Sequence, residues 1–299
     1  MAVYKKTYRG YDGPLTPEWS RFLVLPRFLF EEMQRSRFLS LFFVGTFIFP
    51  LLSAVFIYLH HNLSALAMLE LNPSKLLPID ERFFLFFLGM QSMLAFLLAA
   101  VIGPGLVSPD LSNRALPLYL ARPFSRAEYV LGKMSVLVIL LSSMTWVPGL
   151  MLFSLQSGLA AGGWMTANLR IASGLFVGSL VWIVVLALLV LALSAWVKWK
   201  PIAGGMLFGA FFVGAGFGAL INEVLRTPWG NLINISYLIG KVWIWLFETP
   251  GRRLPGAVFF PGDRRGAISI EWVVAALVVL CAVCLWLLHK RIRGAEVVR

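Results

Sequence analysis

The feature that most restricts the fold of this chain is a series of long apolar segments with almost no charged residue inside them. The segment Leu180–Leu193, LVWIVVLALLVLAL, is typical of the series. A helix needs about 20 apolar residues to cross a hydrocarbon layer of about 30 Å. The segments do not alternate with a period of two, so they predict helices and not the strands of a membrane barrel. The sequence therefore predicts an all-α integral membrane protein.

The predicted spans lie at about 38–60, 83–107, 131–156, 171–197, 202–221 and 271–289. Of the 299 residues, 59% are hydrophobic and 13% are charged, whereas an ordinary soluble domain has about 25% charged residues. The apolar run begins only near Phe38, so no cleaved signal peptide is expected. The predicted organisation is a cytoplasmic N-terminus with an interfacial helix at 1–37, a transmembrane domain at 38–289, and a cytoplasmic tail at 290–299.

Basic residues give the chain a formal net charge of +12. Most of them precede the first span, lie around the loop 108–133, or fall in the C-terminal tail. The short loops of the opposite side hold only Lys75, Arg82 and Arg170. This asymmetry is the positive-inside pattern, and it predicts that both termini are cytoplasmic. Topology thus explains the charge, and no nucleic-acid partner is expected.

The segment 222–270 is an exception, because it lies on the predicted outer side and still carries several basic residues. Within it, Leu232–Phe247 is apolar but short for a crossing, and Lys241 lies near its middle. We interpret it as re-entrant or interfacial, with Trp243 and Trp245 at headgroup depth. If it crosses the membrane instead, the C-terminal tail lies on the other side.

The spans offer few groups for catalysis or ion coupling. Ionisable residues inside a membrane are costly and usually functional, and here the three histidines lie at span ends. The chain has no HExxH, GxSxG or phosphate-binding GxxxxGK[ST] motif. Cys281 and Cys284 share a helix face, but without a neighbouring His or carboxylate we interpret them as packing residues. The sequence predicts no catalytic residue, metal site or nucleotide site.

The fifth span is rich in glycine. Small residues four positions apart let two helix backbones approach closely in lipid. The predicted helix-packing residues are Gly205, Gly209, Gly214 and Gly218. They predict a tight neighbour, either in the same chain or in a second subunit. Pro50 and Pro148 predict kinks in the first and third spans, because each removes a backbone hydrogen bond.

The most informative segment is the loop SPDLSNRALPLYLARPFSRAEYVLGK at 108–133. It resembles the first cytoplasmic loop of the membrane subunits of ABC-2-type transporters. In that family, an acidic residue and a few polar residues precede a leucine-rich turn, an Arg-Pro-hydrophobic-Ser-Arg segment and Leu-Gly-Lys. The chain departs from this pattern at Ala115 and Pro117. The residues that carry the resemblance are Asp110, Asn113, Arg114, Leu120, Arg122, Pro123, Ser125, Arg126, Glu128, Tyr129, Leu131, Gly132 and Lys133.

The resemblance implies a coupling helix that docks on a separate ATPase subunit. The residues expected to contact that subunit are Asp110, Asn113, Arg114, Arg122, Pro123, Ser125, Arg126, Glu128 and Lys133. It also implies a second permease copy or a paralogue, contact with membrane lipid, export of the substrate, and a bacterial plasma (inner) membrane location. ATP and Mg²⁺ would bind the partner subunit. The amphipathic pattern of Pro17–Arg37 is similar to the interfacial helix that precedes the first span in such permeases.

Two other classes of function fit the same spans. The first is a non-transporting membrane scaffold or assembly factor. The second is an enzyme acting on lipid, which would need a clustered acid, base or metal site that the sequence does not show. An adjacent reading frame that encodes an ATPase would favour the permease over both. The expectation is a permease subunit that is not itself an enzyme.

Overall fold

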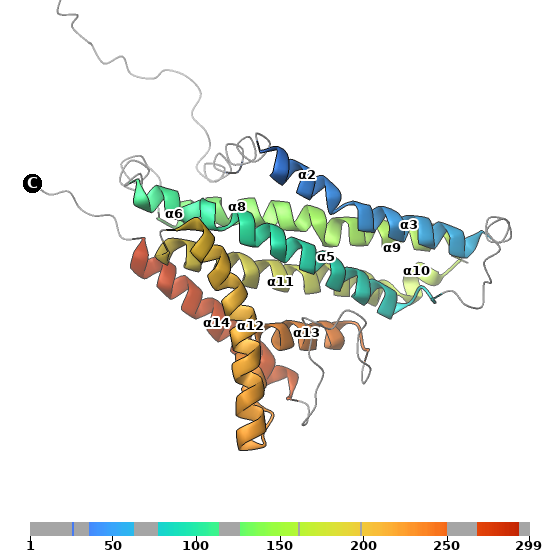
Figure 1. Cartoon of the computed structure of the whole chain (residues 1–299). Helices are drawn as coiled ribbons and strands as arrows, with labels where there is room; N and C mark the ends of the chain where they lie inside the picture. The colour runs from blue at the N-terminus through green and yellow to red at the C-terminus, as the bar shows by residue number, and fades with distance from the viewer. Residues whose placement is uncertain are drawn as a thin grey trace, which may run out of the picture.

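The computed structural model describes residues 36–62, 77–113, 126–160, 162–197, 199–249 and 268–292, together with Pro26. Within these ranges the chain forms helices and no strand (Figure 1). The elements are α2 (Arg37–Gly45), α3 (Ile48–His61), α5 (Glu81–Ile102), α6 (Pro104–Ser112), α8 (Arg126–Met144), α9 (Trp146–Leu159), α10 (Trp164–Ala167), α11 (Leu169–Trp196), α12 (Lys200–Leu225), η3 (Trp229–Ile233), α13 (Ile235–Leu246) and α14 (Ile270–Arg291).

The length and apolar composition of the helices confirm the prediction of a helical multi-pass membrane protein. Six helical stretches of the described chain are long and apolar enough to cross a membrane. The second stretch continues to Ser112 and the third begins at Arg126, because polar turns extend these helices beyond their apolar runs. The six stretches are Arg37–His61, Glu81–Ser112, Arg126–Leu159, Leu169–Trp196, Pro201–Leu225 and Ile270–Arg291.

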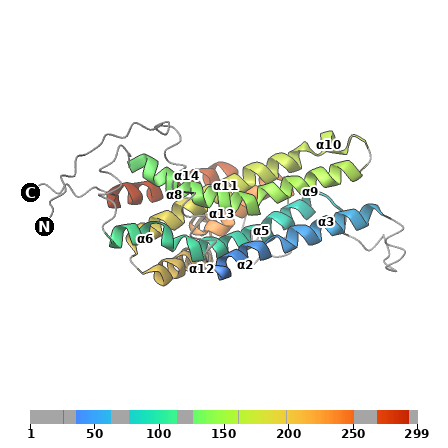
Figure 2. The same ribbon diagram turned by 90° about the horizontal axis from the view of Figure 1, so that it is seen from above.

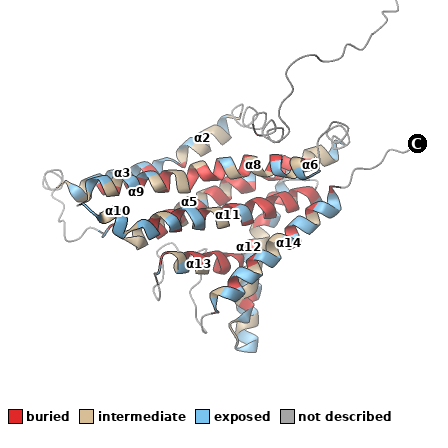
Figure 3. Cartoon of the chain, turned by 180° about the vertical axis from the view of Figure 1, so that it is seen from behind, coloured by how far each residue is buried: buried red, intermediate tan, exposed pale blue. Residues whose placement is uncertain are grey.

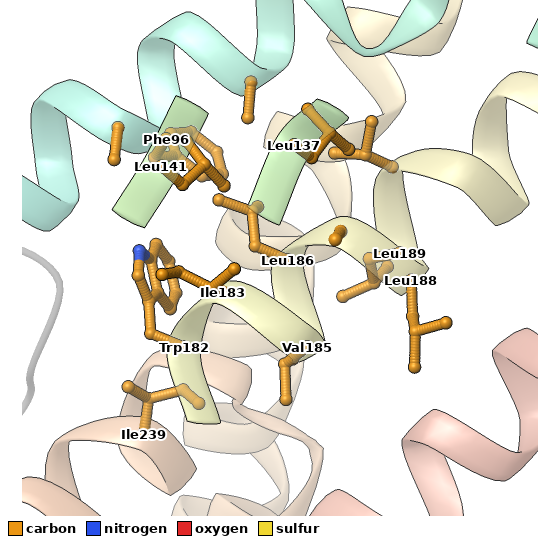
Figure 4. Close-up of a cluster of buried hydrophobic side chains, with 14 of the residues drawn as sticks. Phe96, Leu137, Leu141, Trp182, Ile183, Val185, Leu186, Leu188, Leu189 and Ile239 are labelled. Atoms are coloured by element: carbon orange, nitrogen blue, oxygen red, sulfur yellow. The ribbon is translucent and has the colours of Figure 1, made fainter. Parts of the chain in front are cut away.

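Helix α11 is the centre of the molecule. It contacts α5, α6, α8, α9, α12, α13 and α14. Figure 4 shows Ile183 and Leu186 of α11 facing Leu137 and Leu141 of α8, and all four side chains are fully buried. A helix that is apolar on every side, as α11 is, can be buried by neighbours all round. This arrangement explains why the most apolar segment of the sequence is also the innermost.

The helices around α11 fall into two groups. Helices α3, α5, α8 and α9 run alongside it as an elongated bundle, whereas α12 and α14 diverge from that bundle (Figures 1 and 2). Figure 3 shows buried residues along α11 and exposed residues on α3, α12 and α14. The exposed side chains include large apolar ones such as Leu51, Val213 and Val278. Exposed apolar side chains in this number suit a lipid environment.

The two predicted proline kinks coincide with breaks between helices. Helix α2 ends at Gly45 and α3 begins at Ile48, two residues before Pro50. Proline has no N–H for the carbonyl four residues earlier, which here is Thr46. The side-chain Nε2 of Gln91 donates to that carbonyl at 3.3 Å. The second break, between α8 and α9, precedes Pro148 in the same way.

Helix α13 corresponds to the short apolar segment. Its 12 residues extend about 18 Å, which is too short for a crossing. Trp243 is fully buried against α11, where its Nε1 donates to the Gly178 carbonyl at 2.9 Å. Of the two tryptophans predicted to lie at headgroup depth, Trp243 packs inside the protein and Trp245 has an exposed side chain. The structure contains no membrane, so the re-entrant path stays a prediction.

The glycines of α12 have two different surroundings. A Cβ added at Gly218 would lie 2.4 Å from the Gly230 carbonyl oxygen, and one at Gly214 would lie 3.2 Å from that of Ile233. Both neighbours belong to η3, so this half of the glycine pattern has its tight neighbour within the chain. At Gly205 and Gly209 a Cβ would meet nothing within 4 Å. The predicted interfacial helix at Pro17–Arg37 lies outside the described residues, apart from Pro26 and the residues from 36 onward.

Candidate functional site

The loop singled out by the sequence begins and ends at a buried polar cluster, which we call the Asp110 cluster and which consists of Asp110, Tyr129 and Lys133. Lys133 Nζ lies 2.8 Å from Asp110 Oδ2, and the Tyr129 hydroxyl donates to the same oxygen at 2.8 Å. The Lys133 Nζ also lies 5.7 Å from the centre of the Tyr129 ring. Asp110 comes from α6 and the other two residues come from α8. The cluster therefore joins the helix before the loop to the helix after it.

Lys133 and Tyr129 are more strongly shielded from solvent than Asp110 is. The side-chain exposure is 5% for Lys133 and 16% for Asp110, and Tyr129 is fully buried. Tyr129 and Lys133 are four residues apart, so they share one face of α8. A charge held this far from water requires its partner, because an unpaired buried charge is strongly destabilising. The arrangement can fix the spacing of α6 and α8.

A second contact fixes α6 to the central helix. The N–H groups of Val107 and Ser108 donate to Ser194 Oγ at 3.2 and 3.1 Å, and this hydroxyl donates to the Pro104 carbonyl at 3.0 Å. Pro104 begins α6 and interrupts the helical ladder that continues from α5. The Ser194 hydroxyl supplies hydrogen-bond partners for the backbone N–H and carbonyl groups at this interruption. The start of α6 is thus held by α11, and its end is held by α8.

Close packing at Gly103 completes the anchoring of α6. A Cβ at this residue would lie 1.9 Å from Val190 Cγ1 of α11 and 2.6 Å from the Ala99 carbonyl oxygen. Only glycine avoids both contacts. The junction of α5 and α6 can therefore approach α11 closely enough for the Ser194 hydrogen bonds to form.

The predicted ATPase-contact residues fall into a buried pair, a group that is exposed or half-buried, and a group outside the described residues. Asp110 and Lys133 meet in the buried cluster. Asn113 and Arg126 are exposed at the two ends of the loop, and Glu128 is half-buried. The others, Arg114, Arg122, Pro123 and Ser125, lie outside the described residues. Contact of any of these residues with an ATPase stays a prediction.

Two residues of this region were not expected from the sequence as functional. Tyr129 was quoted only for the resemblance, although its spacing of four from Lys133 was a usable signal. Ser194 gave no signal, because a serine within a long apolar span usually bonds to its own helix. Its role depends on the position of α6, which the sequence does not reveal.

Polar groups elsewhere in the described bundle are scattered. His61 and Gln156 are joined at 3.0 Å between Nε2 and Oε1 at the end of the bundle away from the Asp110 cluster. Among the described residues, no group of three His, Cys, Asp or Glu side chains has the spacing of a metal site. Cys281 and Cys284 are free thiols on α14.

Comparison with protein-family models finds none that matches this chain, and comparison with curated proteins likewise finds no match.

Proposed function

We propose that the chain is the permease subunit of an ABC-2-type transporter, which moves a substrate outward with ATP hydrolysed by a separate subunit. The observation that carries the proposal is the Asp110 cluster. It ties α6, which precedes the segment 114–125, to α8, which follows it, so a force applied to that segment would reach both helices together. Such a connection is what a coupling loop needs in order to move the spans.

The remaining features agree with this function. Among the described residues, Lys133 is the one buried charged side chain, and it is paired with Asp110. With no other charged group inside the described spans to couple to an ion, energy would come from outside the bilayer. In this proposal the Asp110 end of the bundle is cytoplasmic, and α13 is re-entrant from the outer side. The location would be the plasma (inner) membrane of a bacterium, and a second copy or a paralogue would complete the pathway.

The test is a pair of charge reversals in the loop. Arg122→Glu together with Arg126→Glu should abolish co-purification with the ATPase subunit and the transport-coupled part of its turnover, because the basic surface of the loop would then repel an acidic groove. Arg82→Glu is the matched control, since it reverses a charge at the opposite end of a span. The proposal fails if the loop variant binds and stimulates the ATPase as the wild type does. That outcome would favour a non-transporting scaffold.

A further inference from the structure

The C-terminal ends of α11 and α14 are joined by two hydrogen bonds that run in opposite directions. The indole Nε1 of Trp196, the last residue of α11, donates to the Leu287 carbonyl of α14 at 3.3 Å. In return, Nε of Arg291, the last residue of α14, donates to the Ala195 carbonyl of α11 at 3.2 Å. A carbonyl in the last turn of a helix has no partner within that helix. Arg291 therefore completes the end of α11 and is held in a fixed place beside it.

The last two residues of α14 are cations that each lie over an indole ring. Lys290 Nζ is 5.2 Å from the centre of the Trp286 ring, and Arg291 Cζ is 5.6 Å from the centre of the Trp196 ring. A ring face attracts a cation without accepting all of its N–H groups, so the ammonium group keeps donors for an anion. Arg291 uses Nε for the α11 carbonyl, and its two Nη groups form the planar pair of donors that suits phosphate.

The charge balance at this end of the bundle is positive. Neither cation forms an ion pair with a described carboxylate. Asp110 is paired with Lys133, and Glu128 shares the first turn of α8 with Arg126, so these formal charges cancel. The negative ends of the two helix dipoles, equivalent to about half a charge each, offset about one of the two positive charges. About one positive charge remains, which favours an anion.

The face of α14 that carries Lys290 is exposed along its whole length. Trp272, Val279, Val283, Trp286 and Lys290 follow one another at steps of three, four or seven residues, and all are exposed. Trp272 and Lys290 are about 27 Å apart along the helix axis, which is close to the thickness of a hydrocarbon core. Exposed indoles at both ends of an apolar stripe are typical of the two membrane–water interfaces. Lys290 therefore lies at the level of lipid headgroups.

We propose that the joined ends of α11 and α14 bind the headgroup of an anionic phospholipid. The Nη groups of Arg291 and the ammonium group of Lys290 would contact the phosphate. The exposed indoles of Trp196 and Trp286 would lie at the glycerol region, and an acyl chain would follow the apolar stripe of α14. In the predicted orientation this lipid belongs to the cytoplasmic leaflet. The site goes beyond the proposed transport function and does not depend on it, so its test contains no ATPase.

The experiment measures lipid binding to the purified full chain in detergent by native mass spectrometry. The probes are phosphatidylglycerol, which is anionic, and phosphatidylcholine with the same acyl chains, which has no net charge. Lys290→Gln should weaken phosphatidylglycerol binding about fivefold, and addition of Arg291→Gln should weaken it about fivefold more. Lys290→Arg should bind as the wild type does. Arg82→Gln is the control, because it removes an exposed cation at the start of α5, at the opposite end of the bundle.

Three results would overturn the proposal. Equal loss of phosphatidylglycerol in Lys290→Gln and Arg82→Gln would indicate a general effect of protein charge. Phosphatidylcholine binding as tight as that of phosphatidylglycerol would remove the role of the two cations in selecting an anionic headgroup. Displacement of the lipid by inorganic phosphate alone would assign the site to the free anion.

Discussion

At the scale of single residues, the most consequential feature is a lysine buried at the edge of a span. Lys133 has a side-chain exposure of 5% and depends on Asp110 and Tyr129 for its polar contacts in the cluster. Removal of one member of a buried ion pair leaves the other charge without compensation. The Asp110 cluster should therefore be sensitive to single changes and much less sensitive to the paired change.

We expect Lys133→Met to lower the free energy of unfolding by about 3–5 kcal/mol. The double variant Asp110→Leu with Lys133→Met should recover most of this loss, because no unpaired charge remains. The measurement is SDS-induced unfolding in mixed micelles, with Arg126→Gln on the exposed face of α8 as the control. Equal destabilisation in the single and the double variant would contradict the assignment of Lys133 to the ion pair.

A second residue prediction concerns the carbonyl that Pro50 leaves without a helical partner. Gln91→Leu keeps the side-chain volume but removes the hydrogen bond to the Thr46 carbonyl. We expect a loss of about 0.6 kcal/mol, with an upper limit of about 1.7 kcal/mol, as for other hydrogen bonds between membrane helices. The same unfolding assay measures it, and Met93→Leu on the exposed side of α5 is the control. A Gln91→Leu variant as stable as the wild type would show that this bond contributes no more than is gained by removing Gln91 Oε1, which is buried without a partner among the described residues.

At the scale of elements, the packing of neighbouring helices depends on close approaches between their backbones. Helix α12 and η3 meet at Gly218 and Gly230, where an added Cβ would lie 2.4 Å or less from the facing carbonyl oxygen. Asn222 supports the contact, because its Oδ1 accepts from the Gly230 N–H at 2.7 Å. The turn after α12 is thereby fixed against the helix that precedes it.

Gly218→Ala should therefore destabilise the protein by about 1–3 kcal/mol, the usual cost of overpacking. Gly209→Ala on the same helix meets open space, and we expect it to be neutral or slightly stabilising because alanine is the better helix former. Unfolding midpoints of the two variants, measured side by side, test this difference. If both variants behave alike, then η3 does not pack on α12 as described.

The sequence predicted individual elements better than their contacts. Apolar length alone located the six spans, and Pro50 and Pro148 located two helix breaks, because these signals are local. The burial of Lys133 could not be foreseen, since a lysine at a span end is equally typical of the positive-inside pattern. Its partner, Asp110, lies across a loop whose path no local rule determines. Ser194 was missed for the same reason.

At the scale of the whole molecule, the proposed orientation assigns the Asp110 cluster to the cytoplasm and α13 to the outer side. A membrane-impermeant thiol reagent added to intact cells should label Arg82→Cys and should leave Arg126→Cys unlabelled, in a background with both native cysteines replaced. Permeabilised cells should allow labelling of both positions. Labelling of Arg126→Cys in intact cells would reverse the topology and would place the loop away from any cytoplasmic ATPase.

The helices of the molecule form two parts. A bundle around α11 is anchored to the loop helices through the Asp110 cluster and Ser194, whereas α12 and α14 diverge and expose apolar faces. In the proposed transporter, the first part would receive force and the second would face lipid and the second subunit. The segment between α6 and α8 would contact an ATPase.

Cross-linking from Arg126, which is exposed at the start of α8, tests for this contact with the ATPase. The Arg126→Cys chain, with Cys281 and Cys284 replaced by serine, is treated with a short thiol-reactive cross-linker in membranes that contain the candidate ATPase. We expect a cross-link to a subunit with a phosphate-binding loop from Arg126→Cys and none from Arg82→Cys. A cross-link from both positions, or from neither, would contradict contact of this segment with an ATPase.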